Sequence, residues 1–160
     1  MEAESGLVPG RLARGSRCFG AWVGHELVGY GWLSTRSEWI GEVQLEIGLP
    51  AGEAYVWNCV TLARHRRKGV FRALVTAIVG QAHKEGLARV WIASLAGVGG
   101  KTIQQAGFQP VLQFDSAKRL GLHWLRVRPA PGVDPELLTS AREAVAVGGL
   151  SVHRPIVRRH

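Results

Sequence analysis

A strand-like run that ends in a basic turn and continues into a helix is the feature that most constrains the fold. Residues 53–62 are rich in aromatic and β-branched side chains, which favour a central strand. Residues 63–69 read ARHRRKG, and residues 70–84 then repeat apolar side chains at helical spacing until Gly86 ends the pattern. A second buried strand is expected at 89–95. A strand, a helix and a second strand in this order predict a parallel strand pair joined by the helix.

The turn itself predicts a binding site for an anion. The first amides of a helix have no partner within the helix, and the helix dipole makes that end electropositive. Arg66, Arg67, Lys68 and Arg72 add four cations at the same place, and Gly69 allows the backbone to approach a ligand closely. A pyrophosphate is a natural occupant of such a turn.

The rest of the chain predicts short strands with two further helices. Residues 18–23 and 27–33 are expected to form a hairpin, and residues 1–16 are expected to form no regular element. Further strands are expected at 41–47, 111–114 and 121–127, helices at 99–106 and 134–147, and a mobile basic tail at 148–160. In the second of these helices Asp134 is the expected N-cap and Pro135 lies in the first turn.

Composition narrows the class of protein. The 160 residues suit one domain, and 46% hydrophobic with 20% charged residues excludes disorder throughout. No run of 18 apolar residues predicts a membrane span, and no secretory signal is recognised at the N-terminus. Two cysteines suit a reducing cytoplasm, and neither CxxC nor HExxH occurs, so no metal site is expected. The net charge of +8 favours a partner that carries phosphates, either a polymer or a small cofactor.

Three segments resemble the GNAT superfamily of N-acetyltransferases. Residues 66–71, RRKGVF, are similar to its acyl-CoA signature [Q/R]-x-x-G-x-[G/A], although Phe71 replaces the second small residue. Residues 28–31, VGYG, resemble part of the hairpin made by its second and third strands, and residues 105–108, QAGF, resemble the Gly-Phe pair after its fourth helix. The resemblance covers residues 18–128.

The resemblance implies an α/β domain of the α+β type. Its sheet would be mixed and mainly antiparallel, splayed between the fourth and fifth strands and flanked by helices. On this basis residues 1–17 are a flexible lead-in, residues 18–128 a single acyl-CoA-binding domain, and residues 129–160 a C-terminal extension with one helix and a basic tail.

The same resemblance implies acetyl-CoA as co-substrate and a primary amine as acceptor, with no metal. The amine would attack the thioester directly, while a backbone N–H of the fourth strand stabilises the oxyanion. Pantetheine would contact residues 60–62, and the pyrophosphate would lie on the turn. The implied binding residues are Val60, Thr61, Leu62, Arg66, Arg67, Lys68, Gly69, Val70, Phe71 and Arg72.

The catalytic groups depart from the family pattern. Ile103 occupies the position of a tyrosine that often protonates the departing thiolate, and Ala96 that of a frequent asparagine. A thiolate with a pKa of about 8.5 is a tolerable leaving group, which water or Ser94 could protonate. Glu53, at the start of the fourth strand, is the candidate general base. The alternative is that Glu53 is an ordinary solvated carboxylate.

Two wider alternatives remain open. Only some 17 residues precede the hairpin, where the family has a strand and two helices. A truncated start or a second chain would account for this, and the second case predicts a homodimer. The chain could also be a non-catalytic or degenerate acyl-CoA-binding module, or a basic nucleic-acid-binding module. A nucleotide-binding P-loop at 95–102 is disfavoured, because Leu95 stands where that motif requires glycine.

Overall fold

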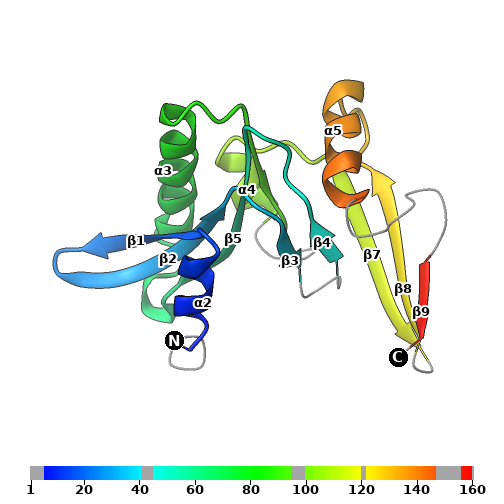
Figure 1. Cartoon of the computed structure of the whole chain (residues 1–160). Coiled ribbons are helices and arrows are strands. Elements are labelled where there is room, and N and C mark those ends of the chain that lie inside the picture. The colour runs from blue at the N-terminus through cyan, green and yellow to red at the C-terminus, as the bar shows by residue number, and fades with distance from the viewer. Residues whose placement is uncertain (1–5, 41–44, 95–99, 120–121, 147–155, 160) are drawn as a thin grey trace. The chain divides into compact units, whose positions relative to one another are not determined.

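The computed structural model describes residues 6–40, 45–94, 100–119, 122–146 and 156–159 (Figure 1). The chain forms two compact units, one from residues 1–36 and 49–108 and the other from residues 37–48 and 109–160. Each unit is described by itself.

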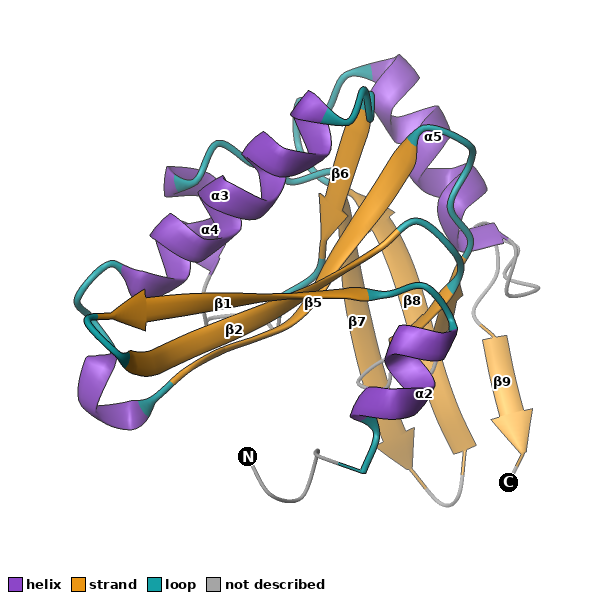
Figure 2. Cartoon of the chain, turned by 60° about the vertical axis from the view of Figure 1, so that its left-hand side comes forward, coloured by secondary structure: helices purple, strands orange, loops and turns teal. Residues whose placement is uncertain are grey.

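The first unit is a four-stranded sheet with helices (Figure 2). Its elements are α2 (Val8–Ala13), β1 (Arg17–Val23), β2 (Glu26–Ser34), β5 (Glu53–Thr61), a 3-10 turn η1 (Ala63–His65), α3 (Val70–Lys84), β6 (Arg89–Ile92) and α4 (Gly100–Gln105). The strand order is β1-β2-β5-β6, and the first two pairings are antiparallel while β5 and β6 are parallel. The helix α3 makes the crossover that this parallel pair requires.

One face of this sheet packs against α3 and forms the core. Leu33 of β2 and Val56 of β5 meet Leu74 and Ile78 of α3, and all four side chains are buried. The apolar positions of α3 recur every three or four residues, so they fall on the side that faces the strands. The core thereby fixes where the first turn of α3 lies relative to the end of β5.

The pairing between β5 and β6 ends halfway along β5, where β6 itself ends at Ile92. Residues 53–56 pair with residues 89–92, whereas the later part of β5 pairs only with β2 among the described residues. Trp57 is the first residue of this open part. One step further on, a β-bulge places Asn58 and Cys59 opposite the single residue Gly31, and Asn58 has a φ of 44°.

The second unit contains two small sheets and one helix. Its elements are β3 (Glu38–Ile40), β4 (Leu45–Ile47), β7 (Leu112–Arg119), β8 (Leu122–Pro129), α5 (Pro135–Ala146) and β9 (Ile156–Arg159). β3 pairs with β4, and β7, β8 and β9 form an antiparallel sheet. Leu45, Leu125 and Val145 form its core. Asp134 caps α5 as expected, because its carboxylate accepts the N–H groups of Glu136 and Leu137 at 2.9 and 3.0 Å.

The predicted fold class is confirmed: the chain is a mixed α+β structure with a mainly antiparallel sheet flanked by helices. The predicted hairpin, the parallel pair and the helix over residues 70–84 are all present. The domain boundaries after residues 17 and 128 stay predictions.

Two expectations for local structure are wrong, and one short strand was not predicted. Residues 8–13 form the helix α2, although residues 1–16 were expected to form no element. Residues 156–159 form β9 within the expected mobile tail, because β8 offers them a free edge to pair with. The short strand β3 was not predicted. Residues 41–44 of an expected strand, and residues 148–155 of the tail, lie outside the described residues.

Candidate functional site

The backbone between β5 and α3 turns sharply at two residues with positive φ. Arg67 has a φ of 60°, and Gly69, the N-cap of α3, has a φ of 81°. No described atom lies within 4 Å of the position that a Cβ on Gly69 would take. Backbone conformation, not crowding within the chain, therefore requires glycine here, and the space beside it is open to a ligand. The N-cap makes no side-chain hydrogen bond to the first amides of α3.

The cations of the turn fall into two groups. Arg64 binds the carboxylate of Glu26, and His65 Nε2 lies 3.3 Å from the same oxygen. Arg64 and, to a lesser extent, His65 hold the pKa of Glu26 below its usual value. The other four cations form no ion pair with a described carboxylate; they are Arg66, Arg67, Lys68 and Arg72. Positive charge without a counter-ion thus gathers at the N-terminus of α3, where the helix dipole adds to it.

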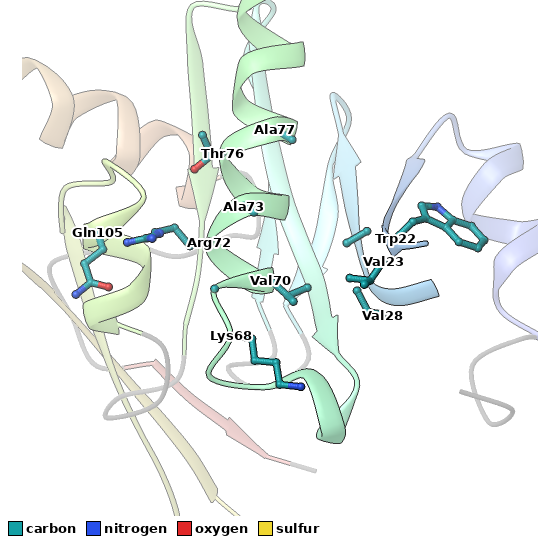
Figure 3. Close-up of a pocket in the computed structure, with 12 residues that line it drawn as sticks. Trp22, Val23, Val28, Lys68, Val70, Arg72, Ala73, Thr76, Ala77 and Gln105 are labelled. Carbon is teal, nitrogen blue, oxygen red and sulfur yellow. The ribbon is translucent and has the colours of Figure 1, made fainter. Parts of the chain in front are cut away.

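An open cavity of about 790 Å³ adjoins this turn (Figure 3). Lys68, Gly69, Val70 and Arg72 line it, so four of the ten predicted binding residues share one cavity. Its remaining lining comes from the β1–β2 hairpin and from later turns of α3 and α4: Ala21, Trp22, Val23, Val28, Ala73, Thr76, Ala77 and Gln105. These eight were not predicted. The sequence signals the hairpin but not which of its residues lie beside α3.

The other six predicted residues do not line this cavity: Val60, Thr61, Leu62, Arg66, Arg67 and Phe71. Val60 and Thr61 end the open part of β5, and the N–H of Leu62 donates to the Val28 carbonyl at 2.9 Å. Arg66 Nε donates to the Thr61 carbonyl at 3.3 Å, which ties the turn to the strand end. The hydroxyl of Thr61 is buried and has no hydrogen-bond partner among the described groups. Such an unpaired polar group favours a ligand that brings a donor or an acceptor.

Glu53 lies at the closed end of β5 and is not solvated. Its carboxylate accepts a hydrogen bond from Arg89 Nη1 at 2.6 Å and another from Trp91 Nε1 at 2.5 Å, and only 9% of its side chain is exposed. Both oxygens therefore have a partner. The alternative of an ordinary surface carboxylate is wrong, while the role as general base stays a prediction. Four residues of strand, about 13 Å, separate Glu53 from Trp57.

Ser94 is the side chain considered for protonating the leaving group, and Ile103 occupies the position of the family's tyrosine. Ile103 is buried in α4, and Ser94 is exposed just after β6. Ala96 lies outside the described residues. The α4 helix ends within six residues, and the N–H of Phe108 bonds the Ile103 carbonyl at 3.3 Å after Gly107 turns the chain. Among the described residues, no three or more His, Cys, Asp or Glu side chains gather where they could hold a metal ion. No helix in the described ranges is both long and apolar enough to cross a bilayer.

An arginine from α2 packs onto two tryptophans on the sheet face opposite α3. The Trp32 and Trp57 rings stack with centroids 5.9 Å apart, and the Arg11 guanidinium carbon lies 5.2 and 4.6 Å from these centroids. Arg11 is the single buried residue of α2. Sequence analysis missed this cluster, although Pro9 in the first turn and Gly15 just past the end are signals of a short helix.

Comparison with known proteins agrees with this geometry. Solved structures with a similar fold include a putative acetyltransferase from Agrobacterium tumefaciens, 18% identical, covering 72% of this chain and 75% of that chain with a TM-score of 0.51. A probable acetyltransferase is 17% identical over 74% of this chain and 76% of that chain, with a TM-score of 0.53. A Bacillus subtilis acetyltransferase in complex with CoA is 19% identical over 71% of this chain and 64% of that chain, with a TM-score of 0.51.

The search of curated proteins found no match. The model of the acetyltransferase (GNAT) family, however, matches residues 4–99, more than half of the chain. This match includes α2, the hairpin, β5 and the cationic turn. The chain belongs to the acetyltransferase (GNAT) family.

Proposed function

We propose that this protein transfers an acetyl group from acetyl-CoA to a primary amine by direct attack in a ternary complex. The observation that carries the proposal is the path of β5. The pairing of this strand with β6 ends at Val56, and the strand leads into a turn where four cations form no ion pair with a described carboxylate. An extended, partly apolar arm that is joined to a pyrophosphate matches both parts of this path.

The chain has residues that fit two parts of acetyl-CoA, the pyrophosphate and the pantetheine arm. The amides at the start of α3, with Arg66, Arg67, Lys68 and Arg72, would hold the pyrophosphate, because they supply donors and positive charge together. Val70 and Phe71, in the first turn of α3, would bring their amides to it. The open edge of β5, including Val60, Thr61 and Leu62, would receive the pantetheine arm by strand-like pairing.

The chemistry needs little from side chains beyond positioning. A backbone N–H on the open part of β5 would stabilise the oxyanion, and the thiolate leaves without a dedicated acid because a thiol has a pKa of about 8.5. Glu53 would accept the proton of the amine as general base through intervening water, because about 13 Å of strand separates it from the open part of β5. Its contacts with Arg89 and Trp91 would then orient the carboxylate.

Calorimetric titration with acetyl-CoA, with ATP–magnesium as the control ligand, tests the site. We expect micromolar binding of acetyl-CoA alone. The Gly69→Val variant should bind acetyl-CoA at least tenfold more weakly, because the substitution disturbs the turn that presents the amides. Gly86→Val is the matched control: Gly86 has a φ of 80° at the other end of α3 and is equally open. Equal affinity of a folded Gly69→Val protein and its control would overturn the site.

The same cations also support a second candidate, a nucleic-acid-binding module. Retention on heparin that free CoA competes away would support the acetyl-CoA site at the turn. Retention that CoA does not change would favour a nucleic-acid partner. Light scattering at several concentrations tests the expected homodimer.

A further inference from the structure

The stacked tryptophans beside the open part of β5 point to the kind of acceptor. Resting on the proposed acetyl transfer, we propose that the Trp32–Trp57 pair binds a cationic group of the acceptor, and that Arg11 occupies this position in the free chain. The acceptor would then carry a second cationic group in addition to the amine that is acetylated. A diamine, a guanidinium-bearing amine and a basic peptide all have this chemistry.

The geometry of the cluster is that of a cation site. A guanidinium or ammonium group within about 6 Å of an indole centroid is attracted by the ring face, and tryptophan is the strongest of the aromatic side chains in this respect. Arg11 satisfies this distance for both rings at once. It is also only 8% exposed, and Trp32 is only 1% exposed, so the cation lies where water screens it little.

A second observation indicates that Arg11 does not satisfy the site completely. The indole N–H groups of Trp32 and Trp57 are both buried, and neither has a hydrogen-bond partner among the described groups. Buried donors without acceptors are rare in proteins and call for an explanation. A guanidinium has donors only, so Arg11 cannot accept from these N–H groups, whereas a carbonyl oxygen of a larger cationic ligand such as a basic peptide could.

The position of Trp57 connects this site to the proposed reaction. Trp57 directly follows Val56, the last residue of β5 that pairs with β6. The rings therefore flank the point at which the pairing of the two strands ends. The amine that attacks must be uncharged, so the group held on the rings is a different one, and it positions the reacting end.

In this proposal the cationic group of the acceptor displaces the Arg11 guanidinium from the two rings. Arg11 is the single buried residue of a six-residue helix, and Leu7 and Leu12 beside it are more than half exposed. Gly15 ends the helix, so that the N–H of Ser16 bonds the Arg11 carbonyl at 3.1 Å. This bond holds the backbone of Arg11 and does not involve the side chain that contacts the rings.

Nuclear magnetic resonance of the two indole N–H groups tests the site directly. Their signals are assigned with Trp32→Phe and Trp57→Phe, and the probes are butylguanidinium and its uncharged analogue butylurea at 0.15 M salt. We expect Arg11→Ala to bind butylguanidinium at least tenfold more tightly than the wild type, with shifts of both signals. Arg14→Ala removes an exposed arginine three residues away and is the matched control. Arg11→Gln replaces Arg11→Ala if the latter does not fold.

Two results would overturn the proposal: equal butylguanidinium affinity in the Arg11 and Arg14 variants, or equal affinity of Arg11→Ala for butylguanidinium and butylurea. Calorimetry with acetyl-CoA is run on the same proteins, and absence of that binding counts against the acetyl-transfer function while the cation result still stands or falls on its own. If acetyl-CoA binds, Arg11→Ala should raise kcat/KM for butane-1,4-diamine more than for butylamine. Equal changes for both amines would contradict the inferred acceptor class.

Discussion

The two faces of the four-stranded sheet differ in what they contain. The face toward α3 is aliphatic, and Leu33, Val56 and Ile78 pack there without polar partners. The opposite face presents Trp32 and Trp57 with a buried arginine on them, and Glu53 in its ion pair lies on the same side of β5. Packing on the first face positions the start of α3 relative to the sheet. The second holds ionised and aromatic groups, which we propose act in recognition.

This difference indicates how the family fold is divided between stability and chemistry. A helix packed on one face must hold the cationic turn in place, so substitutions there should affect folding first. Groups on the opposite face can change without moving that turn. Four experiments can break or sharpen this comparison.

The two cysteines give the largest expected contrast. Burial among the α3 core residues raises the pKa of the Cys59 thiol to about 12, whereas Cys18 is exposed on β1. At pH 8 Cys59 should contain roughly three orders of magnitude less thiolate than an ordinary exposed thiol. We expect Ellman's reagent to label Cys59→Ser, through Cys18, within minutes, and Cys18→Ser only on unfolding. Fast labelling of Cys18→Ser would show that the α3 face opens readily.

The substitution Ile78→Ala should lower the free energy of unfolding by about 2–5 kcal/mol, because it leaves a cavity in a fully buried part of the core. Denaturant unfolding measures the change. Acetyl-CoA affinity of the folded protein should stay within twofold of the wild type. The control is His83→Ala on the exposed side of α3, expected to stay within about 0.5 kcal/mol. A large loss of affinity in folded Ile78→Ala would mean that the core and the turn are not separable.

The substitution Glu53→Gln should cost about 1–3 kcal/mol, because it leaves the partly buried Arg89 without its counter-charge. If Glu53 is the general base, kcat should also fall much more than in Arg89→Gln. The double variant should then be no slower than Glu53→Gln alone. Equal losses of kcat in both single variants would assign the pair a structural role only.

The smallest effect is expected at an exposed ion pair. Arg17 of β1 donates two hydrogen bonds, of 2.5 and 2.7 Å, to the carboxylate of Glu85, which follows α3. These bonds, with help from Gln81, lower the pKa of Glu85 to about 2. The carboxylate therefore stabilises the fold above its unfolded pKa of 4.5, and this contribution is lost as the pH falls toward 2. We expect Glu85→Gln to lower the melting temperature slightly at pH 7 but not near pH 2, since the pair is exposed. A difference that persists at pH 2 would contradict this origin; Glu143→Gln, an exposed carboxylate of α5, is the control.

Sequence analysis predicted most of the first unit because its signals are local. The run from residue 53 to Gly86 contains its own strand pattern, turn residues and helix stop, and the helix has the predicted bounds. The side-chain contacts around Glu53 and Trp57, in contrast, join residues that are distant in the sequence. Arg89 and Arg11 are far in sequence from Glu53 and Trp57, and nothing in the spacing pairs them. The strand β9 depends on an edge supplied by β8, which residues 156–159 do not reveal by themselves.

The bulge at Asn58 changes which residues of β5 face each side of the sheet. Before it, the odd-numbered residues 53 and 57 share the aromatic face, and the even-numbered 54 and 56 enter the α3 core. The extra residue shifts the phase, so that the odd-numbered Cys59 belongs to the core side instead. Within its nine residues, the strand therefore changes from even-numbered to odd-numbered residues on the core side. Deletion of Asn58 would remove the bulge and restore one continuous alternation, in which Cys59 stays on the core side.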